Sequence, residues 1–241
     1  MDVWKGRKLG NPESSLVISN LISRLVNYFR QHGFRATLHR FDLALRRLLS
    51  AGRMVLFYYD FPPFRVTAPI SGWPEHLKVE RKQSHEEIDQ QDLQKILNFW
   101  NPRLARRSLS ERFEAGASLW LIRSMGQLAG YGWTLTGRTV RPYFLPLGAS
   151  DVHLFDFLVF PEYRGRRINP SLVIYILDQL SREDSSRAYI EVAEWNHPEM
   201  TSLSKTAFHF LGVARKTSLL GRTIVEWQRD RANQDVKHKH S

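Results

Sequence analysis

The sequence of 241 residues contains no cysteine. This absence excludes disulfides, cysteine-bound zinc and a thiol nucleophile, and it is compatible with a reducing compartment. Long apolar runs are also missing. None approaches the roughly 20 residues of a membrane-spanning helix, and the N-terminal residues contain no apolar signal core. We therefore expect a cytoplasmic protein.

The sequence has fewer acidic than basic residues. It contains 24 Asp and Glu and 35 Lys and Arg, which gives a formal net charge of +11. The excess favours an anionic partner, such as CoA, nucleic acid, a phosphorylated sugar or an acidic membrane surface. A solvated, arginine-rich surface would give the same balance. No zinc finger, aromatic RNA-binding strand motif or helix-turn-helix pattern is present, which disfavours nucleic acid as the partner. The hydrophobic content of 42% predicts a folded core.

The first 76 residues have the pattern of a basic amphipathic extension followed by a linker. Apolar residues recur at helical spacing from Leu16 to Arg30 and again from Leu38 to Leu48. Seven arginines and one acid lie between Ser14 and Arg53. This predicts a helical hairpin, which either packs on the main domain or lies peripherally on an anionic membrane, at its inner surface. Packing is favoured, because amphipathicity is first a sign of packing. A strand over 54–59 and a linker rich in Pro and Gly over 61–76 follow.

Residues 77–228 alternate between strand and helix signals, and a charged tail predicted to be disordered follows over 229–241. Expected strands cover 77–83, 118–123, 128–135 (extended by 143–147), 151–160, 188–193, 213–218 and 222–227. Expected helices cover 84–100, 103–115, 169–180 and 199–210.

The chain is organised around a strand, a basic turn and a helix. Apolar residues from Leu154 to Phe160 lead into Pro161, and a turn with three arginines and one glycine follows. Asn169 suits the N-cap of the next helix and Pro170 its first position. Free amides and the helix dipole would make this turn an anion cradle.

The turn resembles the acyl-CoA-binding element "P-x-Y-R-G-x-G" of the GNAT acyltransferase superfamily. Pro161, Tyr163, Arg164 and Gly165 match it, whereas Arg167 replaces the second small residue. The order of elements over 77–228 supports the resemblance. It implies an α+β fold, an α/β/α sandwich with a mixed, mostly antiparallel sheet and splayed central strands, preceded by the N-terminal helical extension.

The resemblance also implies acetyl-CoA or another acyl-CoA as co-substrate and no metal. The pantetheine would lie in the gap between the splayed strands and would contact the backbone of Leu158, Val159 and Phe160. The remaining cofactor-binding residues would hold the pyrophosphate and the cofactor arm: Arg164, Gly165, Arg166, Arg167, Ile168, Asn169 and Asn196.

The implied reaction is direct acyl transfer to an amine, assisted by a general base. Asp156 and Glu191 are the candidate catalytic carboxylates, with Asp151, His153 and Glu194 as further carboxylate or imidazole groups on the same strands. Alternation along the strand places Asp156 on the face opposite Phe155 and Phe157, among apolar neighbours. A structural acceptor role for Asp156 is the competing interpretation.

The usual acid for the leaving thiolate is absent, because Phe208 occupies the position at which many relatives carry tyrosine. Either solvent protonates the thiolate, or the domain is catalytically weak and serves to bind CoA or a partner. The sequence leaves the acceptor open among a small amine, an aminosugar and a protein amine.

Overall fold

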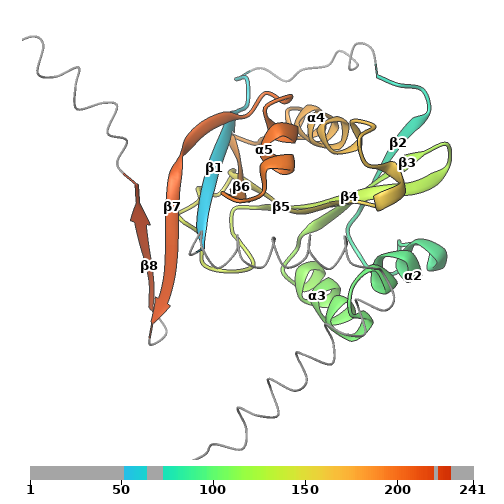
Figure 1. The fold of residues 1–241 in the computed structure, drawn as a ribbon, viewed down its shortest axis with the longest axis horizontal. Helices are drawn as coiled ribbons and strands as arrows, with labels where there is room; N and C mark the ends of the chain where they lie inside the picture. Colours follow the sequence, from blue (N-terminus) through green and yellow to red (C-terminus); the bar gives the residue numbers. More distant parts are fainter. Residues whose placement is uncertain (1–51, 64–72, 220–221, 229–241) are drawn as a thin grey trace, which may run out of the picture. The chain divides into compact units, whose positions relative to one another are not determined.

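The computed structural model describes residues 52–63, 73–219 and 222–228. Within them, one sheet has the strand order β2-β3-β4-β5-β6-β1-β7-β8 (Figure 1). Every neighbouring pair is antiparallel except β5 and β6, which are parallel. The strands are Arg53–Asp60 (β1), Leu77–Lys82 (β2), Ser118–Ser124 (β3), Gln127–Thr136 (β4), Val152–Val159 (β5), Arg187–Ala193 (β6), His209–Leu219 (β7) and Arg222–Trp227 (β8).

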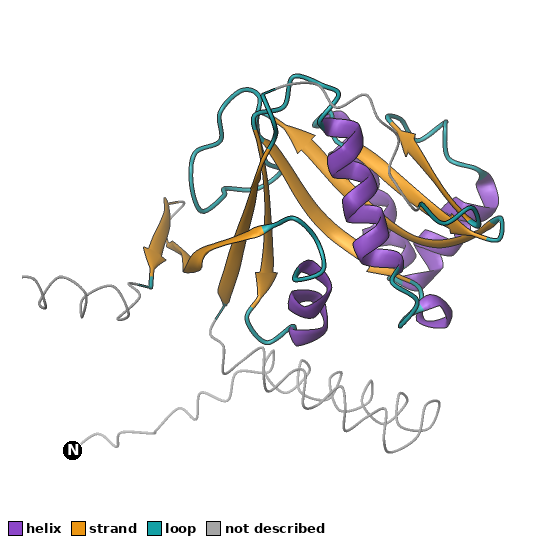
Figure 2. Ribbon diagram, turned by 90° about the horizontal axis from the view of Figure 1, so that it is seen from above, coloured by secondary structure: helices purple, strands orange, loops and turns teal. Residues whose placement is uncertain are grey.

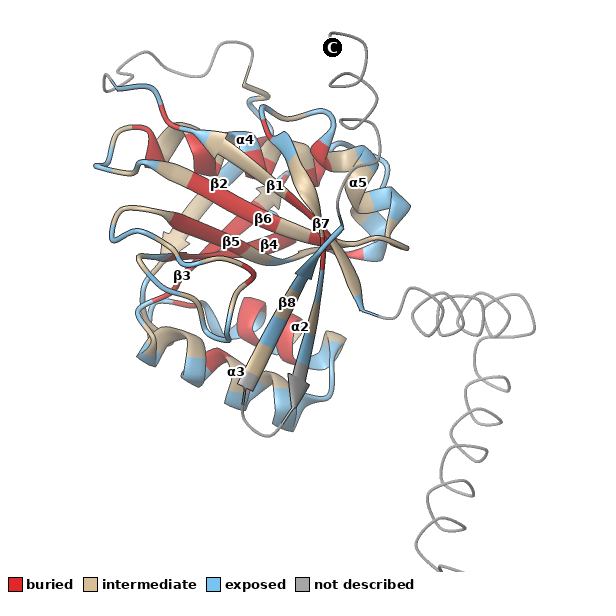
Figure 3. Cartoon of the chain, turned by 90° about the vertical axis from the view of Figure 1, so that its left-hand side faces the viewer, coloured by how far each residue is buried: buried red, intermediate tan, exposed pale blue. Residues whose placement is uncertain are grey.

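Helices cover both faces of this sheet, which confirms the predicted three-layer, mostly antiparallel fold (Figure 1). Helix α4 (Ile168–Leu180) lies across one face, as Figure 2 shows, and α5 (His197–Leu203) lies on that face too. Helices α2 (Gln90–Phe99) and α3 (Pro102–Glu114) pack on the other. The buried residues gather on the central strands and on the inner sides of the helices (Figure 3).

Helices α2 and α3 begin at residues whose side chains can cap a helix N-terminus. The side chain of Asp89 accepts a hydrogen bond from the amide of Gln91 and caps α2. Asn101 caps α3 in the same way, through the amide of Leu104, and Pro102 occupies the first turn, where its missing amide hydrogen costs little. The α2–α3 pair predicted from the sequence is therefore present, although α2 begins at Gln90 rather than near residue 84.

Two predicted elements differ from the structure. The late helix predicted over 199–210 ends at Leu203, and residues from His209 onward form β7 instead. The segment after residue 208 pairs with β1 as a strand, and a short apolar run in the sequence does not by itself distinguish such a strand from a helix. No strand forms over 143–147. Phe144 is buried there against Leu56 and Ala214 from an irregular segment.

Strand β1 lies in the middle of the sheet, between β6 and β7. Its backbone pairs with β6 from Met54 to Asp60 and with β7 from Arg53 to Tyr58. The sequence predicts this segment as part of the N-terminal extension, ahead of a domain that begins at residue 77. The sheet instead takes in a strand from before that boundary, because only the pairing of distant strands shows where a short apolar run docks.

The predicted helical hairpin before residue 52, with its membrane alternative, and the predicted tail over 229–241 lie outside the described residues. Among the described helices, none has the length and apolar content needed to cross a membrane.

Candidate functional site

The two parallel strands β5 and β6 separate soon after they meet. They pair only from Val152 to Leu154, opposite Ala188 to Ile190. Beyond this point β5 continues to Val159 along β4, while β6 continues to Ala193 along β1. The splay expected from the sequence between these strands is therefore present, and it leaves one backbone edge of each strand without a strand partner.

An irregularity in β5 lies directly beside the splay. Asp156 has a positive φ of 51°, and the β4–β5 register shifts between Tyr131 and Trp133, so that two residues of β5 oppose Gly132. A Cβ atom on Gly132 would lie 2.4 Å from the Phe157 ring, so glycine makes room for the bulged strand. Such a bulge redirects the side chains that follow it.

The bulge changes the orientation of Asp156. Phe155 packs in the apolar cluster under α2 and α3, whereas Phe157 packs in the cluster under α4. Asp156 lies on the α3 side, where its carboxylate accepts from Arg112 Nη1 at 2.6 Å. The expectation that Asp156 lies opposite both rings is therefore wrong for Phe155, because alternation fails at a bulge. Asp156 is also exposed and paired with a cation rather than enclosed by apolar groups.

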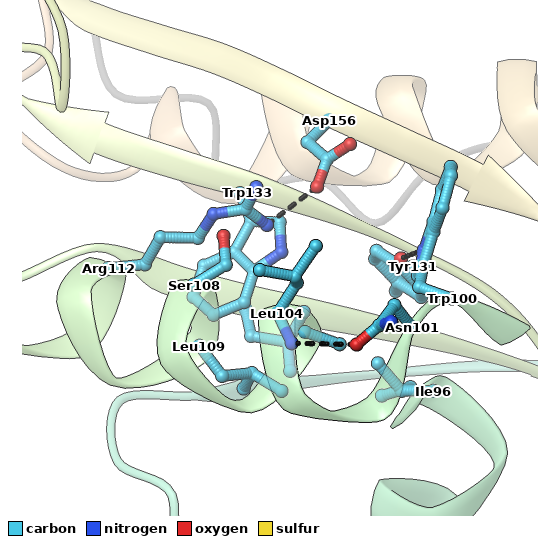
Figure 4. A pocket seen from close by; sticks show the side chains of 12 residues that line it. Ile96, Trp100, Asn101, Leu104, Ser108, Leu109, Arg112, Tyr131, Trp133 and Asp156 are labelled. Carbon is cyan, nitrogen blue, oxygen red and sulfur yellow. Dashed lines mark hydrogen bonds and ion pairs between the residues drawn. The ribbon is translucent and has the colours of Figure 1, made fainter. Parts of the chain in front are cut away.

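A cavity of about 350 Å³ opens next to this ion pair, between α2, α3 and the sheet (Figure 4). Its lining is mostly apolar: Ile96, Trp100, Asn101, Leu104, Ala105, Ser108, Leu109, Arg112, Leu119, Tyr131, Trp133 and Asp156. Burial raises the pKa of Tyr131 to about 12, so its hydroxyl stays protonated, and it accepts a hydrogen bond from Trp100 Nε1 at 2.9 Å. The guanidinium of Arg112 lies over the Trp133 and Phe155 rings, at 5.1 and 5.5 Å from their centroids.

Glu191 lies one residue beyond the last β5–β6 pair. Its Oε2 is 2.8 Å from Nε2 of the buried His153, and the two side chains bridge the strands where they part. His153 stacks on Phe155, with ring centroids 5.0 Å apart, and contacts the ring of Tyr143 at 4.6 Å. Burial, and then the charge of Glu191, raise the pKa of the Tyr143 hydroxyl far above its usual range. Glu191 is thus held in a fixed orientation, unlike a solvated surface acid.

The basic turn has the backbone shape of an anion cradle. Gly165 and Arg167 both have positive φ, 76° and 60°, and α4 starts directly after Arg167 with its first-turn amides free of helical partners. A Cβ atom on Gly165 would meet nothing within 4 Å, so the glycine is needed for conformation rather than for local space. Successive amides around such left-handed residues converge on an anion.

The three arginines of the turn differ in their contacts. Arg164 Nε donates to the carbonyl of Val159 at 3.3 Å, at the end of β5. Arg166 lies over the ring of Tyr163, 5.8 Å from its centroid. Arg167 is exposed, and within the described parts of the chain it forms no ion pair. The bulky side chain that replaces a small residue of the motif therefore points away from the packed interior.

At the end of β5, the backbone groups of some residues bond to β4, and those of others face the splay. The amide of Phe160 donates to the carbonyl of Ala129 on β4, so it is already used within the sheet. Because successive residues of a strand direct their hydrogen-bonding groups to opposite sides, Val159 between Leu158 and Phe160 faces the splay. Of the three predicted pantetheine contacts, Val159 has the orientation that a backbone contact requires.

Two asparagines that were predicted to bind the cofactor stabilise helices through their side chains. Asn169 is buried inside the first turn of α4, so Arg167, not Asn169, is the N-cap, and Pro170 is the third helical residue. Asn169 Nδ2 donates to Glu199 Oε1 at 2.8 Å and to the Ser202 hydroxyl at 2.9 Å, which joins α4 to α5. The side chain of Asn196 accepts from the amide of Glu199 and caps α5. Both side chains thus have structural partners, and Asn169 would reach an anion at the cradle only through its backbone amide.

Arg112 and Tyr143, which complete the surroundings of Asp156 and Glu191, are not predicted from the sequence. Arg112 lies in a helix with several arginines, and Tyr143 lies in a segment predicted as a strand extension, so neither carried a distinguishing signal.

The other candidate carboxylates have local structural partners. Asp151 Oδ2 accepts from the amide of Gly148 at 2.8 Å, and Glu194 pairs with Arg53 at 2.9 Å. Phe208 is buried beside Tyr59 in the segment before β7 rather than on a helix. In the described residues no three His, Asp or Glu side chains are grouped as a metal site would need.

Comparison with known proteins gives a family. No curated protein matches the sequence. Solved structures with a similar fold include a GNAT-family acetyltransferase from Colwellia psychrerythraea (10% identity, TM-score 0.47, covering 73% of this chain and 55% of that one). Another is a putative GNAT-family acetyltransferase from Novosphingobium aromaticivorans (13% identity, TM-score 0.44, 67% and 61%). The chain thus spans less than two thirds of the length of either. The model of the acetyltransferase (GNAT) family matches residues 77–202, and the chain therefore belongs to the GNAT acetyltransferase family.

Proposed function

We propose that this protein is an N-acyltransferase that moves an acetyl or other acyl group from acyl-CoA to a primary amine. The observation that carries the proposal is the splay of β5 and β6. The two strands pair over only three residues, and β5 then leads to a glycine–arginine turn at the start of a helix. A free strand edge suits an extended amide-containing arm, and the turn suits a pyrophosphate.

The acyl-CoA would follow the course set by β5. Val159 would bond the pantetheine through its backbone, with Leu158 and Phe160 beside it. The pyrophosphate would lie on the amides from Gly165 to Asn169, with the exposed side chains of the turn adding positive charge. In this arrangement the Arg164 side chain releases the Val159 carbonyl or shares it with the cofactor.

Asp156 is the first candidate for the base, because it lines the cavity and lies at the bulge beside the splay. Glu191, oriented by His153, is the second. The amine nitrogen attacks the thioester carbon, the carbon–sulfur bond breaks and the amine proton passes to the base. Asp156→Asn is expected to lower the rate about 10²- to 10⁴-fold while acyl-CoA binding persists. A near-normal rate in this variant, with a slow Glu191→Gln, would transfer the role of base to Glu191.

The thiolate would take its proton from solvent, because Phe208 has no proton to give. The same observation favours a second candidate function, a catalytically weak domain that binds CoA without turnover. The cytoplasmic location also stays a prediction from the sequence.

Thermal unfolding with acetyl-CoA tests the binding site. A ligand at a hundredfold excess over its Kd stabilises the folded state by about 2.7 kcal/mol, which raises the Tm by several degrees. Gly165→Asp is expected to abolish the shift, because it places negative charge at the cradle. Gly126→Asp is a matched control, since Gly126 also has positive φ (78°) and open space around a Cβ atom, but lies in the β3–β4 turn. Absence of a shift with any acyl-CoA would exclude both candidate functions. A shift without release of CoA to any amine would select the second.

A further inference from the structure

The cavity beside Asp156 combines an apolar interior with one pair of opposite charges. Figure 4 shows Asp156 and Arg112 together at one end of the lining side chains, with Leu109 and Ile96 at the other. Its volume of about 350 Å³ is at the lower end of the range for small-molecule sites, so it suits a compact ligand.

The charged pair restricts the head group of such a ligand. Arg112 and Asp156 lie 2.6 Å apart and together carry no net charge. A ligand with only an ammonium group would be attracted by Asp156 and repelled by Arg112, and a ligand with only a carboxylate would meet the reverse. A zwitterionic head, with both groups on neighbouring atoms, is the complement of the pair.

Arg112 is equipped to bind a carboxylate. A guanidinium has five N–H donors in a fixed plane, and the pair with Asp156 is formed by Nη1. Contacts with the faces of Trp133 and Phe155 hold the plane in place. Donors fixed in this way bind a carboxylate with little further loss of side-chain entropy.

We propose that the acceptor is a free α-amino acid with a large apolar side chain, aromatic or branched. Its carboxylate binds Arg112, its ammonium group binds Asp156 and its side chain fills the cavity. The inference rests on the proposed function and names its substrate class. The α-nitrogen forms a bond to the acyl carbon, the bond from that carbon to sulfur breaks, and the ammonium protons pass through Asp156 to solvent and thiolate. The products are an N-acyl amino acid and CoA.

The test uses the full chain, acetyl-CoA and a thiol reagent, which detects only released CoA because the protein has no cysteine. L-Phenylalanine is compared with L-phenylalaninamide, which keeps the ring and the amine but lacks the carboxylate charge, and with glycine, which lacks the side chain. We expect kcat/KM for phenylalanine to exceed both by about 10- to 100-fold, the effect of one charge-assisted contact or one buried side chain. Equal use of the amide, or preference for a polyamine or an aminosugar, would overturn the inference.

Two substitutions test whether Arg112 and the cavity produce the preference for phenylalanine. Arg112→Gln is expected to remove the preference for phenylalanine over its amide, while Arg106→Gln, an exposed arginine of α3 outside the cavity, keeps it. Ala105→Phe fills the cavity and is expected to lower the use of phenylalanine more than that of glycine. If Ala105→Phe instead impairs only octanoyl-CoA, the cavity holds the acyl chain and the inference is wrong. Melting curves identify any variant that fails to fold, and Arg112→Met, which also removes the charge, then replaces Arg112→Gln.

Calorimetric binding of phenylalanine separates this inference from the proposed function. Binding that depends on Arg112 without CoA release from any amine would support the amino-acid site and contradict the acyltransferase. Acetyl transfer to other amines without binding of apolar amino acids would support the acyltransferase and contradict this inference.

Discussion

His153 Nε2 lies 2.8 Å from Glu191 Oε2, and this bond joins β5 to β6 at the point where the strands separate. A carboxylate only accepts, so the imidazole donates through Nε2. Both side chains are largely withdrawn from solvent, with 8% and 19% of their surfaces exposed. The pair therefore lies at the closed end of the gap between the strands, and it holds Glu191, the second candidate for the general base, in one orientation.

Removing one partner of this pair is expected to cost more than changing its charge. Glu191→Leu leaves the buried imidazole donor unsatisfied and should lower the free energy of unfolding by about 1–3 kcal/mol. Glu191→Gln keeps an acceptor oxygen and should cost less, while acetyl-CoA still raises its Tm. Urea unfolding of the two variants makes the comparison, and equal losses would show that the bond contributes little to stability.

Strand β1 is expected to be indispensable for the fold. It pairs along both edges, and Leu56 within it is fully buried. Without it, β7 and β8 would lose their connection to the rest of the sheet. A fragment of residues 52–241 should unfold cooperatively, whereas a fragment of residues 77–241 should not, although it retains the whole segment that matches the family. Circular dichroism during heating distinguishes them, and a cooperative transition in the shorter fragment would contradict the prediction.

Gly130 is expected to tolerate no side chain. A Cβ atom there would lie 2.5 Å from the carbonyl oxygen of Leu158, a backbone atom of β5 that cannot rotate away. Gly130→Ala should therefore destabilise the fold by about 1–3 kcal/mol and displace the strand edge that faces the splay. The Tm and its shift with acetyl-CoA should both fall. Gly148→Ala is the control, since its Cβ atom would come no closer than 3.3 Å to Asp151 and demands only a small adjustment.

Glu199 predicts a pH-dependent contribution to stability. Burial raises the pKa of its carboxyl above the usual range, and the hydrogen bond from Asn169 only partly offsets this. Between the ordinary and the raised pKa the folded state binds more protons than the unfolded state, so this group lowers the free energy of unfolding as pH rises through that window. The Tm of the wild type minus that of Glu199→Gln should therefore decrease from about pH 4 toward neutrality. A difference that stays constant with pH would exclude the effect.

Local sequence alone determined the elements whose signals are short-range. The two helices expected over 84–100 and 103–115 correspond to α2 and α3, although the caps Asp89 and Asn101 were not predicted. The apolar run before Pro161 forms β5, and the glycine–arginine turn precedes α4. These features depend on neighbours along the chain, and their order was enough to predict the layered sheet and the family.

Tertiary structure alone decided where the chemistry lies. Strand β1 docks in the middle of the sheet because both its edges find partners, and the bulge at Asp156 forms because Gly132 on another strand leaves room for Phe157. The bulge directs Asp156 to Arg112 and the cavity, and the short parallel pairing of β5 and β6 brings His153 to Glu191. These contacts join residues far apart in the chain, and neither periodicity nor a motif encodes them, because they arise from the register between strands.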